Sequence, residues 1–487
     1  MNEILTKRRA GILLHITSLP SADLGKDAYY FVDFLHDCGI TVWQTLPLGM
    51  THADGSPYQS LSAHAGNTSL IDINQLVESN WLQADDLCDA CRGSVAFNKF
   101  CLLAKAYSGF LQRADAKDQK EFKQFCKDKA YWLDNFALFM ALRYQFCQMP
   151  WSQWPKPLRD REKKAIKEAS LKLKHQIAGY KFEQFIFYKQ WMAIKHYANQ
   201  RGVYLFGDIP IFVSYDSADV WANPKVFKLD EEGQMPVVAG VPPDYFSETG
   251  QRWGNPHYNW EYLQQTGFAW WLDRMRSQSE QFDILRIDHF RGLEAAWEIP
   301  SDQETAQVGQ WVVAPGYELL QAIKAEVGSV ALVAEDLGII TPEVEALRDG
   351  FDLPGMKILQ FAFGGGPDNP YLPDNYGKNC VAYTGTHDND TTLGWASKLS
   401  DHEKHYVYEY LGNPAMPLHQ ALVQSALASV ANLAVIPMQD ILELGSEHRM
   451  NTPGTTVGNW GWCFHWEQLT PERAGRLSYW VGLFNRK

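Results

Sequence analysis

The sequence predicts a closed (β/α)₈ TIM barrel, and three observations lead to that fold. Eight short apolar runs have the composition of buried strands, and helical stretches separate most of them. This alternation is typical of a parallel sheet, and eight such units suggest closure into a barrel. An open doubly wound sheet is the alternative fold. No Gly-x-Gly-x-x-Gly motif follows a predicted strand, and this argues against a dinucleotide-binding site.

The predicted strands are short and mostly apolar, with many β-branched residues, which is the pattern of strands buried on both faces. They are expected at residues 10–16, 41–46, 203–206, 282–287, 330–334, 356–361, 380–383 and 434–438. Apolar residues at helical spacing predict helices between them. These helices are expected at residues 28–38, 180–200, 317–327 and 342–348, with a further one around residue 271.

Two stretches fit none of these units. From about residue 80 to 175 the composition shifts to Lys, Asp, Ala and Leu with helically spaced apolar residues, so we expect a helical insertion. Residues 212–260 are rich in Pro, Gly and aromatic residues and are expected to form a long loop insertion, which in a compact domain is usually functional. With these insertions, residues 1–487 would form a single catalytic barrel domain.

Composition narrows the choice of partners and compartment. The 57 acidic and 44 basic residues give a formal charge of -13, which argues against nucleic acid or a membrane surface but not against a neutral ligand. The 18 Trp, 22 Tyr and 25 Phe suit sugar rings, although a large core would explain most of them. The cysteines are scattered, with only Cys88 and Cys91 forming a C-x-x-C, and no membrane-length apolar run occurs. We therefore expect a cytoplasmic protein with reduced thiols.

Four of the predicted strands are followed by acidic residues. In strand order these are Asp208, Asp288, Glu335 and Asp388. All strand exits of a parallel barrel lie on the face where active sites are built. A single acid at a strand end is more often a helix N-cap, but four on one face would repel one another unless they had a task or a counter-charge. Arg286 and His387 are suitable counter-charges.

The exit of the strand at 282–287 is unusual because Asp288 lies between two guanidinium groups, those of Arg286 and Arg291. A structural ion pair that caps the strand would explain it, and so would a carboxylate that Arg286 keeps ionised for a substrate. Enzymes that cleave glycosidic bonds use two facing carboxyl groups, of which one is ionised and the other protonated. A metal site is the other use of clustered acids, but the chain has no His-x-x-x-His spacing near them.

Motifs along nearly the whole chain can be compared with those of known families. At the strand exits they are Leu285-Arg286-Ile287-Asp288-His289-Phe290-Arg291, Ala334-Glu335-Asp336-Leu337-Gly338 and Thr384-Gly385-Thr386-His387-Asp388-Asn389. The others occupy residues 11–20, 56–60, 207–211, 216–221, 240–247, 250–256 and 451–455. Together they resemble the 4-α-glucanotransferases of the amylomaltase (disproportionating enzyme) type, which are related to the α-amylase superfamily.

The resemblance implies a retaining enzyme that transfers α-1,4-glucan segments through a covalent glycosyl-enzyme intermediate. It implies that Asp288 is the nucleophile, Glu335 the general acid/base and Asp388 a third acid that holds sugar hydroxyls. Substrate-binding roles are implied for Tyr58, Asp208, Tyr245, Phe246, Gln251, Trp253, Arg286, His387 and Asn451. Core packing is the alternative for Tyr58 and Trp253. The partners would be maltooligosaccharides and other α-1,4-glucans, and no metal or cofactor is implied.

The chain departs from the family pattern after the Ser-Pro-Tyr motif. A Phe-Ala-Gly-Asn-Pro run is usual there, whereas residues 64–68 read His-Ala-Gly-Asn-Thr. We expect His64 and Thr68 to alter a subsite wall or an outer glucan site, but not the acids. Two other functions stay open at this point. One is an α-glucan hydrolase, and the other is an inactive glycan-binding protein, against which the intact acids argue.

The resemblance also generates a prediction about water exclusion. Tyr245 and Phe246 lie in a Pro-rich segment, residues 242–256, that is expected to cover the acceptor site and stack an incoming glucan. Replacing both residues with Ala should admit water and raise hydrolysis relative to transfer. The ratio is measured as reducing ends formed per glucosyl unit transferred from maltotriose, and an unchanged ratio would contradict this role.

Overall fold

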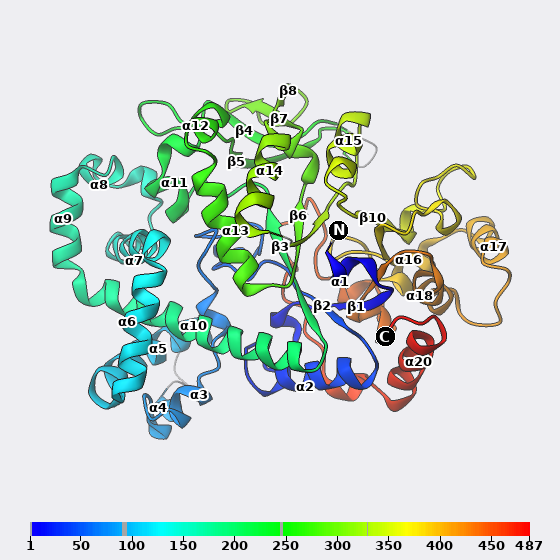
Figure 1. Cartoon of the computed structure of the whole chain (residues 1–487), viewed down its shortest axis with the longest axis horizontal. Helices are drawn as coiled ribbons and strands as arrows, with labels where there is room; N and C mark the ends of the chain where they lie inside the picture. Colours follow the sequence, from blue (N-terminus) through cyan, green and yellow to red (C-terminus); the bar gives the residue numbers. More distant parts are fainter. Residues whose placement is uncertain (1, 90–94, 244–246, 329) are drawn as a thin grey trace.

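Eight parallel strands form the centre of the computed structural model, which describes residues 2–89, 95–243, 247–328 and 330–487 (Figure 1). Their order around the sheet is β10-β11-β12-β1-β2-β3-β6-β9. The strands are β1 (Arg9–Leu13), β2 (Val42–Gln44), β3 (Tyr204–Pro210), β6 (Ile284–Asp288), β9 (Ala331–Ala334), β10 (Gly355–Ile358), β11 (Cys380–Tyr383) and β12 (Leu433–Pro437). The two end strands, β9 and β10, nearly close the ring, and the N–H of Ala334 donates to the carbonyl of Pro354 between them, at 2.9 Å. The predicted barrel and its eight strands are confirmed.

Alternate side chains of the strands enter two different apolar cores. Phe206, Ile284 and Val333 are buried in a cluster inside the barrel. Their neighbours Leu205 and Leu285 are buried in a larger cluster between the strands and the helices. Because both faces of each strand are covered, the strands read as continuous apolar runs, and this is why they could be located in the sequence.

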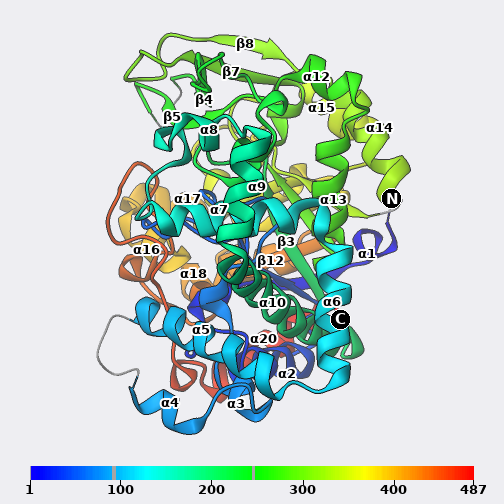
Figure 2. The same cartoon turned by 90° about the vertical axis from the view of Figure 1, so that its left-hand side faces the viewer.

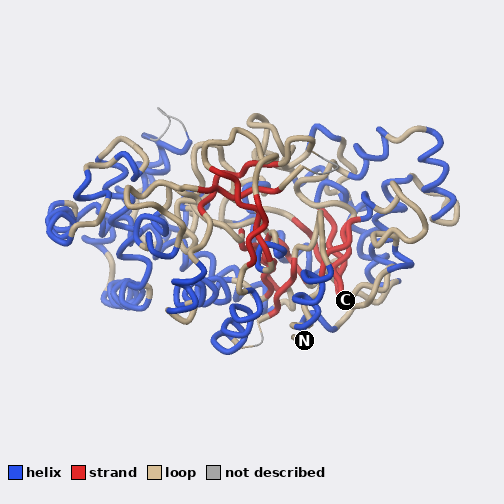
Figure 3. Tube along the Cα trace, turned by 90° about the horizontal axis from the view of Figure 1, so that it is seen from above, coloured by secondary structure: helices blue, strands red, loops and turns tan. Residues whose placement is uncertain are grey.

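Helices surround the strands on the outside of the barrel (Figure 3). The longer ones are α2 (Lys26–Asp37), α10 (Lys174–Gln200), α13 (Ala269–Gln281), α14 (Gly316–Val327), α15 (Pro342–Gly350), α17 (Asp401–Tyr410), α18 (Leu418–Ala428) and α20 (Pro471–Leu483). The shorter ones are α1 (Glu3–Thr6), α3 (Asn74–Glu78), α11 (Ala218–Ala222), α12 (Trp260–Gln265), α16 (Thr392–Lys398) and α19 (Met438–Ile441). No helix in the described ranges is long and apolar enough to cross a membrane.

Residues 80–175 contain a group of helices that lies to one side of the barrel, beside α10 (Figures 1 and 2). They are α4 (Ala84–Asp89), α5 (Val95–Arg113), α6 (Ala116–Asp128), α7 (Ala130–Gln145), α8 (Lys156–Arg159) and α9 (Lys163–Lys172). Aromatic side chains join the group to α10: the ring of Phe110 lies 5.1 Å from that of Trp81 and 5.0 Å from that of Phe182. Burial of these rings fixes the group to the barrel.

The expectation of an unstructured loop at 212–260 is wrong. The stretch contains α11, β4 (Val237–Val241) and β5 (Gln251–Pro256). These strands join β7 (Ala295–Pro300) and β8 (Gln310–Val313) in an antiparallel sheet of order β5-β4-β7-β8, which lies at the top of the molecule in Figures 1 and 2. Strand β5 was missed because its sequence, Gln-Arg-Trp-Gly-Asn-Pro, shows no alternation of apolar and polar residues.

A buried arginine joins the two ends of the chain, and this generates a prediction about stability. Arg486 is fully buried and donates to the carbonyls of Arg9 (2.9 Å) and Ser429 (2.8 Å) and to that of Leu427. An Arg486→Met substitution should lower the free energy of unfolding by about 3 kcal/mol, because it leaves buried carbonyls without donors. The midpoint of thermal unfolding measures the effect. Lys120→Met at an exposed position of α6 is the control, and equal midpoints for the two variants would contradict the prediction.

Candidate active site

A cavity of about 560 Å³ lies at the carboxyl ends of the barrel strands, next to the small antiparallel sheet. The part of its lining that the sequence predicted consists of Tyr58, Gln251, Trp253, Arg286, Asp288, Glu335, Asp388 and Asn451. These residues come from β5, β6 and several loops that follow barrel strands. The structure therefore brings together side chains that are up to about 400 positions apart in the sequence.

Arg286 bridges two carboxylates at the centre of this site. Strands β3 and β6 pair so that Asp208 lies opposite Arg286. The guanidinium donates to Asp208 Oδ2 at 2.6 Å and lies 2.9 Å from Asp288 Oδ1. Burial alone would lower the pKa of Arg286, but the two carboxylates outweigh burial and raise that pKa well above its ordinary value. The arginine is therefore permanently charged and holds Asp288 in one orientation.

Glu335 lies beside Asp288 because their strands are neighbours. Ile287 of β6 pairs with Ala334 of β9, so the residues that follow leave the barrel side by side. His289 has a left-handed backbone, with φ of 52°, and its N–H donates to Glu335 Oε2 at 2.6 Å. Glu335 Oε1 accepts a second bond, from the N–H of Leu337, at 3.1 Å. Two backbone donors thus fix the carboxyl group of Glu335.

The two carboxyl groups compete for a proton. Burial raises the pKa of Glu335, and it raises the pKa of Asp288 well above its ordinary value although Arg286 opposes this. The negative charge of Glu335 adds to the effect on Asp288. Because burial and the neighbouring negative charge disfavour the ionised forms, these two carboxyl groups take up protons at a higher pH than isolated carboxyl groups do.

Asp388 is the most exposed of the predicted acids, with 46% of its side chain accessible. Its Oδ1 accepts a bond from the side-chain amide of Asn451 at 2.6 Å and lies 3.4 Å from His387 Nε2. The backbone N–H of Asn451 in turn donates to the carbonyl of His387, at 3.1 Å. Asp388 therefore presents an accessible carboxylate whose position is fixed by the neighbouring loop.

Asp208 and His387 do not line the cavity, although a lining role was expected for both. Asp208 is buried beneath the site and accepts a hydrogen bond from the hydroxyl of Tyr58 at 2.7 Å. His387 is buried too, and its ring stacks on that of Tyr58 with a centroid distance of 5.2 Å and an interplanar angle of 12°. Burial lowers the pKa of His387. Both residues therefore position Tyr58, and Asp208 also positions Arg286.

Two tryptophans in the lining were not predicted as site residues. The ring of Trp460 lies 6.0 Å from that of Tyr58 and 6.1 Å from that of His387. Trp311, on β8, lies under the guanidinium of Arg291 at 3.7 Å. Trp460 closely follows the 451–455 motif, so its position in the sequence could have indicated a place near the site. Nothing in the local sequence distinguished Trp311, because its strand was not predicted.

Some predicted residues are outside the part of the chain that the structure describes. Tyr245, Phe246 and Cys91 belong to this group, and the side chain of Cys88 is not described either. Within the described residues, no three His, Cys, Asp or Glu side chains are grouped so that they could hold a metal ion.

Comparison with known proteins agrees with this geometry. A family model for 4-alpha-glucanotransferase matches residues 14–469. A 4-alpha-glucanotransferase of Thermus thermophilus is 49% identical, over 96% of this chain and 97% of that protein. One of Synechocystis sp. is 47% identical, over 99% of both chains. The solved structure of an amylomaltase from Streptococcus agalactiae in complex with acarbose superposes with a TM-score of 0.95, at 39% identity, covering 99% of this chain and 100% of that one.

The matched region includes seven of the eight barrel strands, since β1 ends one residue before it, and it contains every residue placed in the cavity above. The family match thus covers most of the fold and the whole site, and the chain belongs to the 4-alpha-glucanotransferase family.

Proposed function

We propose that this protein transfers a segment of an α-1,4-glucan to the 4-hydroxyl of an acceptor glucan or glucose, with retention at the anomeric carbon. The observation that carries the proposal is the pairing of Asp288 and Glu335 in one cavity, with Arg286 fixing the first and two backbone N–H groups fixing the second. Retaining enzymes use two carboxyl groups about 5–5.5 Å apart, and we expect that separation for Asp288 and Glu335, which follow the paired residues Ile287 and Ala334.

In the first half of the reaction, the Asp288 carboxylate attacks the anomeric carbon of the donor. The protonated Glu335 gives its proton to the glycosidic oxygen, whose bond to the anomeric carbon breaks, and the released chain carries a new hydroxyl. The donor segment is now bound to Asp288 as an ester. Arg286 orients Asp288 for the attack and stabilises its carboxylate before and after the ester exists.

In the second half, the ionised Glu335 takes the proton from the 4-hydroxyl of an acceptor. The acceptor oxygen bonds to the anomeric carbon, the ester bond breaks, and the electron pair returns to the Asp288 carboxylate. Two inversions give overall retention. The proton that Glu335 receives restores the starting state, and the raised pKa of Glu335 suits a group that must hold a proton when the donor binds.

The other lining residues suit an α-glucan. Asp388 and Asn451 offer an accessible carboxylate and an amide for sugar hydroxyls. Tyr58, Trp253 and Trp460 offer ring faces on which sugars stack. The indole N–H of Trp253 donates to Gln251 at 3.1 Å, so the two side chains from β5 are held together at the cavity wall. We infer that Gln251 and Trp253 contact the glucan near the acceptor side.

Incubation with maltotriose tests the proposed activity directly. Transfer should produce glucose and a ladder of longer oligomers while the number of reducing ends stays nearly constant, because each transfer breaks one bond and forms another. Chromatography of the products together with a reducing-end assay measures both quantities. A steady rise in reducing ends without longer products would instead indicate a hydrolase.

The same assay with an Asp288→Asn variant tests whether the activity depends on Asp288. Its turnover should fall by on the order of 10⁴-fold or more, because the attacking carboxylate is gone. Asp302→Asn, the same substitution at an exposed acid between β7 and β8, is the matched control and should retain full activity. Equal activities of the two variants would remove Asp288 from the mechanism.

A further inference from the structure

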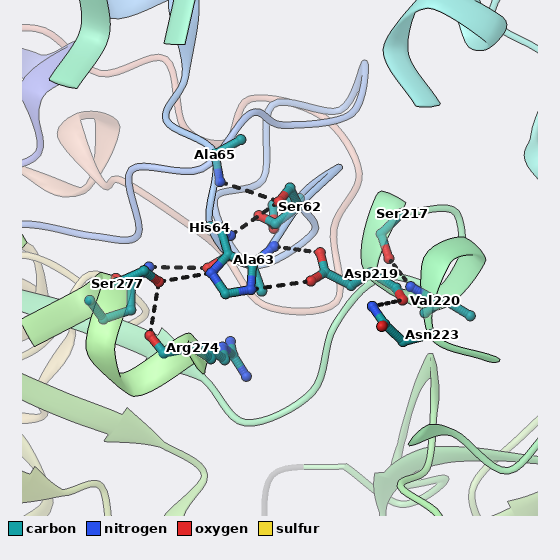
Figure 4. Close-up of polar contacts among 12 residues, drawn as sticks. Ser62, Ala63, His64, Ala65, Ser217, Asp219, Val220, Asn223, Arg274 and Ser277 are labelled. Atoms are coloured by element: carbon teal, nitrogen blue, oxygen red, sulfur yellow. Dashed lines mark hydrogen bonds and ion pairs between the residues drawn. The ribbon is translucent and has the colours of Figure 1, made fainter. Parts of the chain in front are cut away.

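His64, where the chain departs from the family pattern, does not line the active-site cavity. It is buried in a polar network, with its Nδ1 2.8 Å from the hydroxyl oxygen of Ser277 and its Nε2 3.7 Å from Asp219 Oδ1 (Figure 4). The imidazole thus bonds to neighbouring protein groups and adds nothing to the wall of that cavity. Selection among glucans has to be sought in the lining residues themselves.

Trp311 is a lining residue to which the proposed mechanism assigns no task. It lies on β8, the edge strand of the small sheet, and 38% of it is accessible. The guanidinium of Arg291 covers one face of the indole, 3.7 Å from the ring centroid. Trp297, its pairing partner on β7, has its ring centroid 5.3 Å away at an interplanar angle of 61°. These contacts hold the indole in one orientation while part of it stays accessible.

Two short segments connect Glu335 to Trp311. In the first, the N–H of His289 donates to Glu335 Oε2 at 2.6 Å, and Arg291, two residues later, lies on the indole of Trp311. The second follows Glu335 itself and ends at Ile339, whose carbonyl accepts a hydrogen bond from Arg291. Both segments line the cavity. Trp311 therefore belongs to the wall on the Glu335 side.

Trp253 is connected more directly to the acid. Its ring lies 4.7 Å from that of His289, the residue whose N–H is bonded to Glu335, whereas Trp311 is reached through Arg291. The cavity of about 560 Å³ is within the range that holds drug-sized ligands, so it has room for more than one sugar ring. The two indoles can therefore serve successive rings of one chain, with Trp253 next to the acid.

We propose that Trp311 is a stacking platform for an outer glucosyl unit of the acceptor, and so determines the preference for acceptor length. Glu335 protonates the leaving chain and deprotonates the acceptor, so both of these chains extend from its side of the cavity. A glucose acceptor fills only the position beside Glu335 and Trp253. The outer rings of a longer acceptor reach Trp311, whose accessible indole suits the apolar face of a sugar. The inference rests on the proposed function.

The test is a competition between two acceptors in one reaction. Isotope-labelled glucose and isotope-labelled maltotriose are mixed with unlabelled maltoheptaose as donor, and mass spectrometry measures the initial rate at which each label enters longer products. The ratio of the two rates reports the ratio of their kcat/KM values and does not depend on how much of a variant is folded. In Trp311→Ala the maltotriose-to-glucose ratio should fall roughly fivefold or more, because only the longer acceptor loses a contact.

Two further variants make the comparison specific. Tyr479→Ala removes an exposed aromatic ring on α20, away from the small sheet in Figure 1, and should leave the ratio unchanged. Trp311→Phe keeps an aromatic face and should give a ratio at least about twice that of Trp311→Ala. If Trp311→Ala yields no soluble protein, Trp311→Leu takes its place with the same expected fall.

The outcomes separate this inference from the proposed function. A smaller fall in the variant without the ring, an equal fall in Tyr479→Ala, or a Trp311→Phe ratio no higher than that of Trp311→Ala would overturn the role of Trp311. Equal losses for glucose and maltotriose leave the ratio unchanged and would overturn it too, because a purely structural change acts on both acceptors. If the wild-type protein labels no longer product from either acceptor, the proposed function fails, and this inference fails with it.

Discussion

The ion pairs of Arg286 are the constraint on which the site depends. Asp208 and Asp288 are held on either side of one buried guanidinium. Two buried carboxylates without this cation would repel each other and take up protons, and removal of one partner from such a group costs several kcal/mol. The group is possible only because β3 and β6 pair in a register that sets Asp208 opposite Arg286. The register of two barrel strands therefore determines how the charged side chains of the site are placed.

The site is built in two layers. Asp208 and His387 lie below the surface and fix Tyr58 and Arg286, while Asp288, Glu335 and Asp388 face the cavity. The lower layer supplies the charge and the ring stacking that hold Tyr58 and Arg286 in place. The small sheet, which the barrel itself does not require, completes the cavity wall with Trp253 and Trp311.

The barrel and the acids at its strand exits could be located because buried parallel strands are apolar throughout and end abruptly in charged residues. Strand β5 could not, since Gln251–Pro256 forms a surface sheet whose residues do not alternate. A strand exit also does not reveal how deeply a side chain is buried, and Asp208 lies beneath the residues that line the cavity. Trp460 could not be assigned to the site either, because it lies far from Tyr58 in the sequence and only the fold brings the two rings together.

The central claim is that Asp288 forms a covalent bond to the sugar while Glu335 moves the proton. Incubation of a Glu335→Gln variant with α-maltotriosyl fluoride tests this claim. Fluoride is a good leaving group and departs without a general acid, so the sugar ester can form. The ester then accumulates, because the variant has no general base to activate an acceptor. Mass spectrometry of the digested protein should find one maltotriosyl group on Asp288, with a burst of about one fluoride per chain. A sugar on any other residue, or no bound sugar despite fluoride release, would contradict the account.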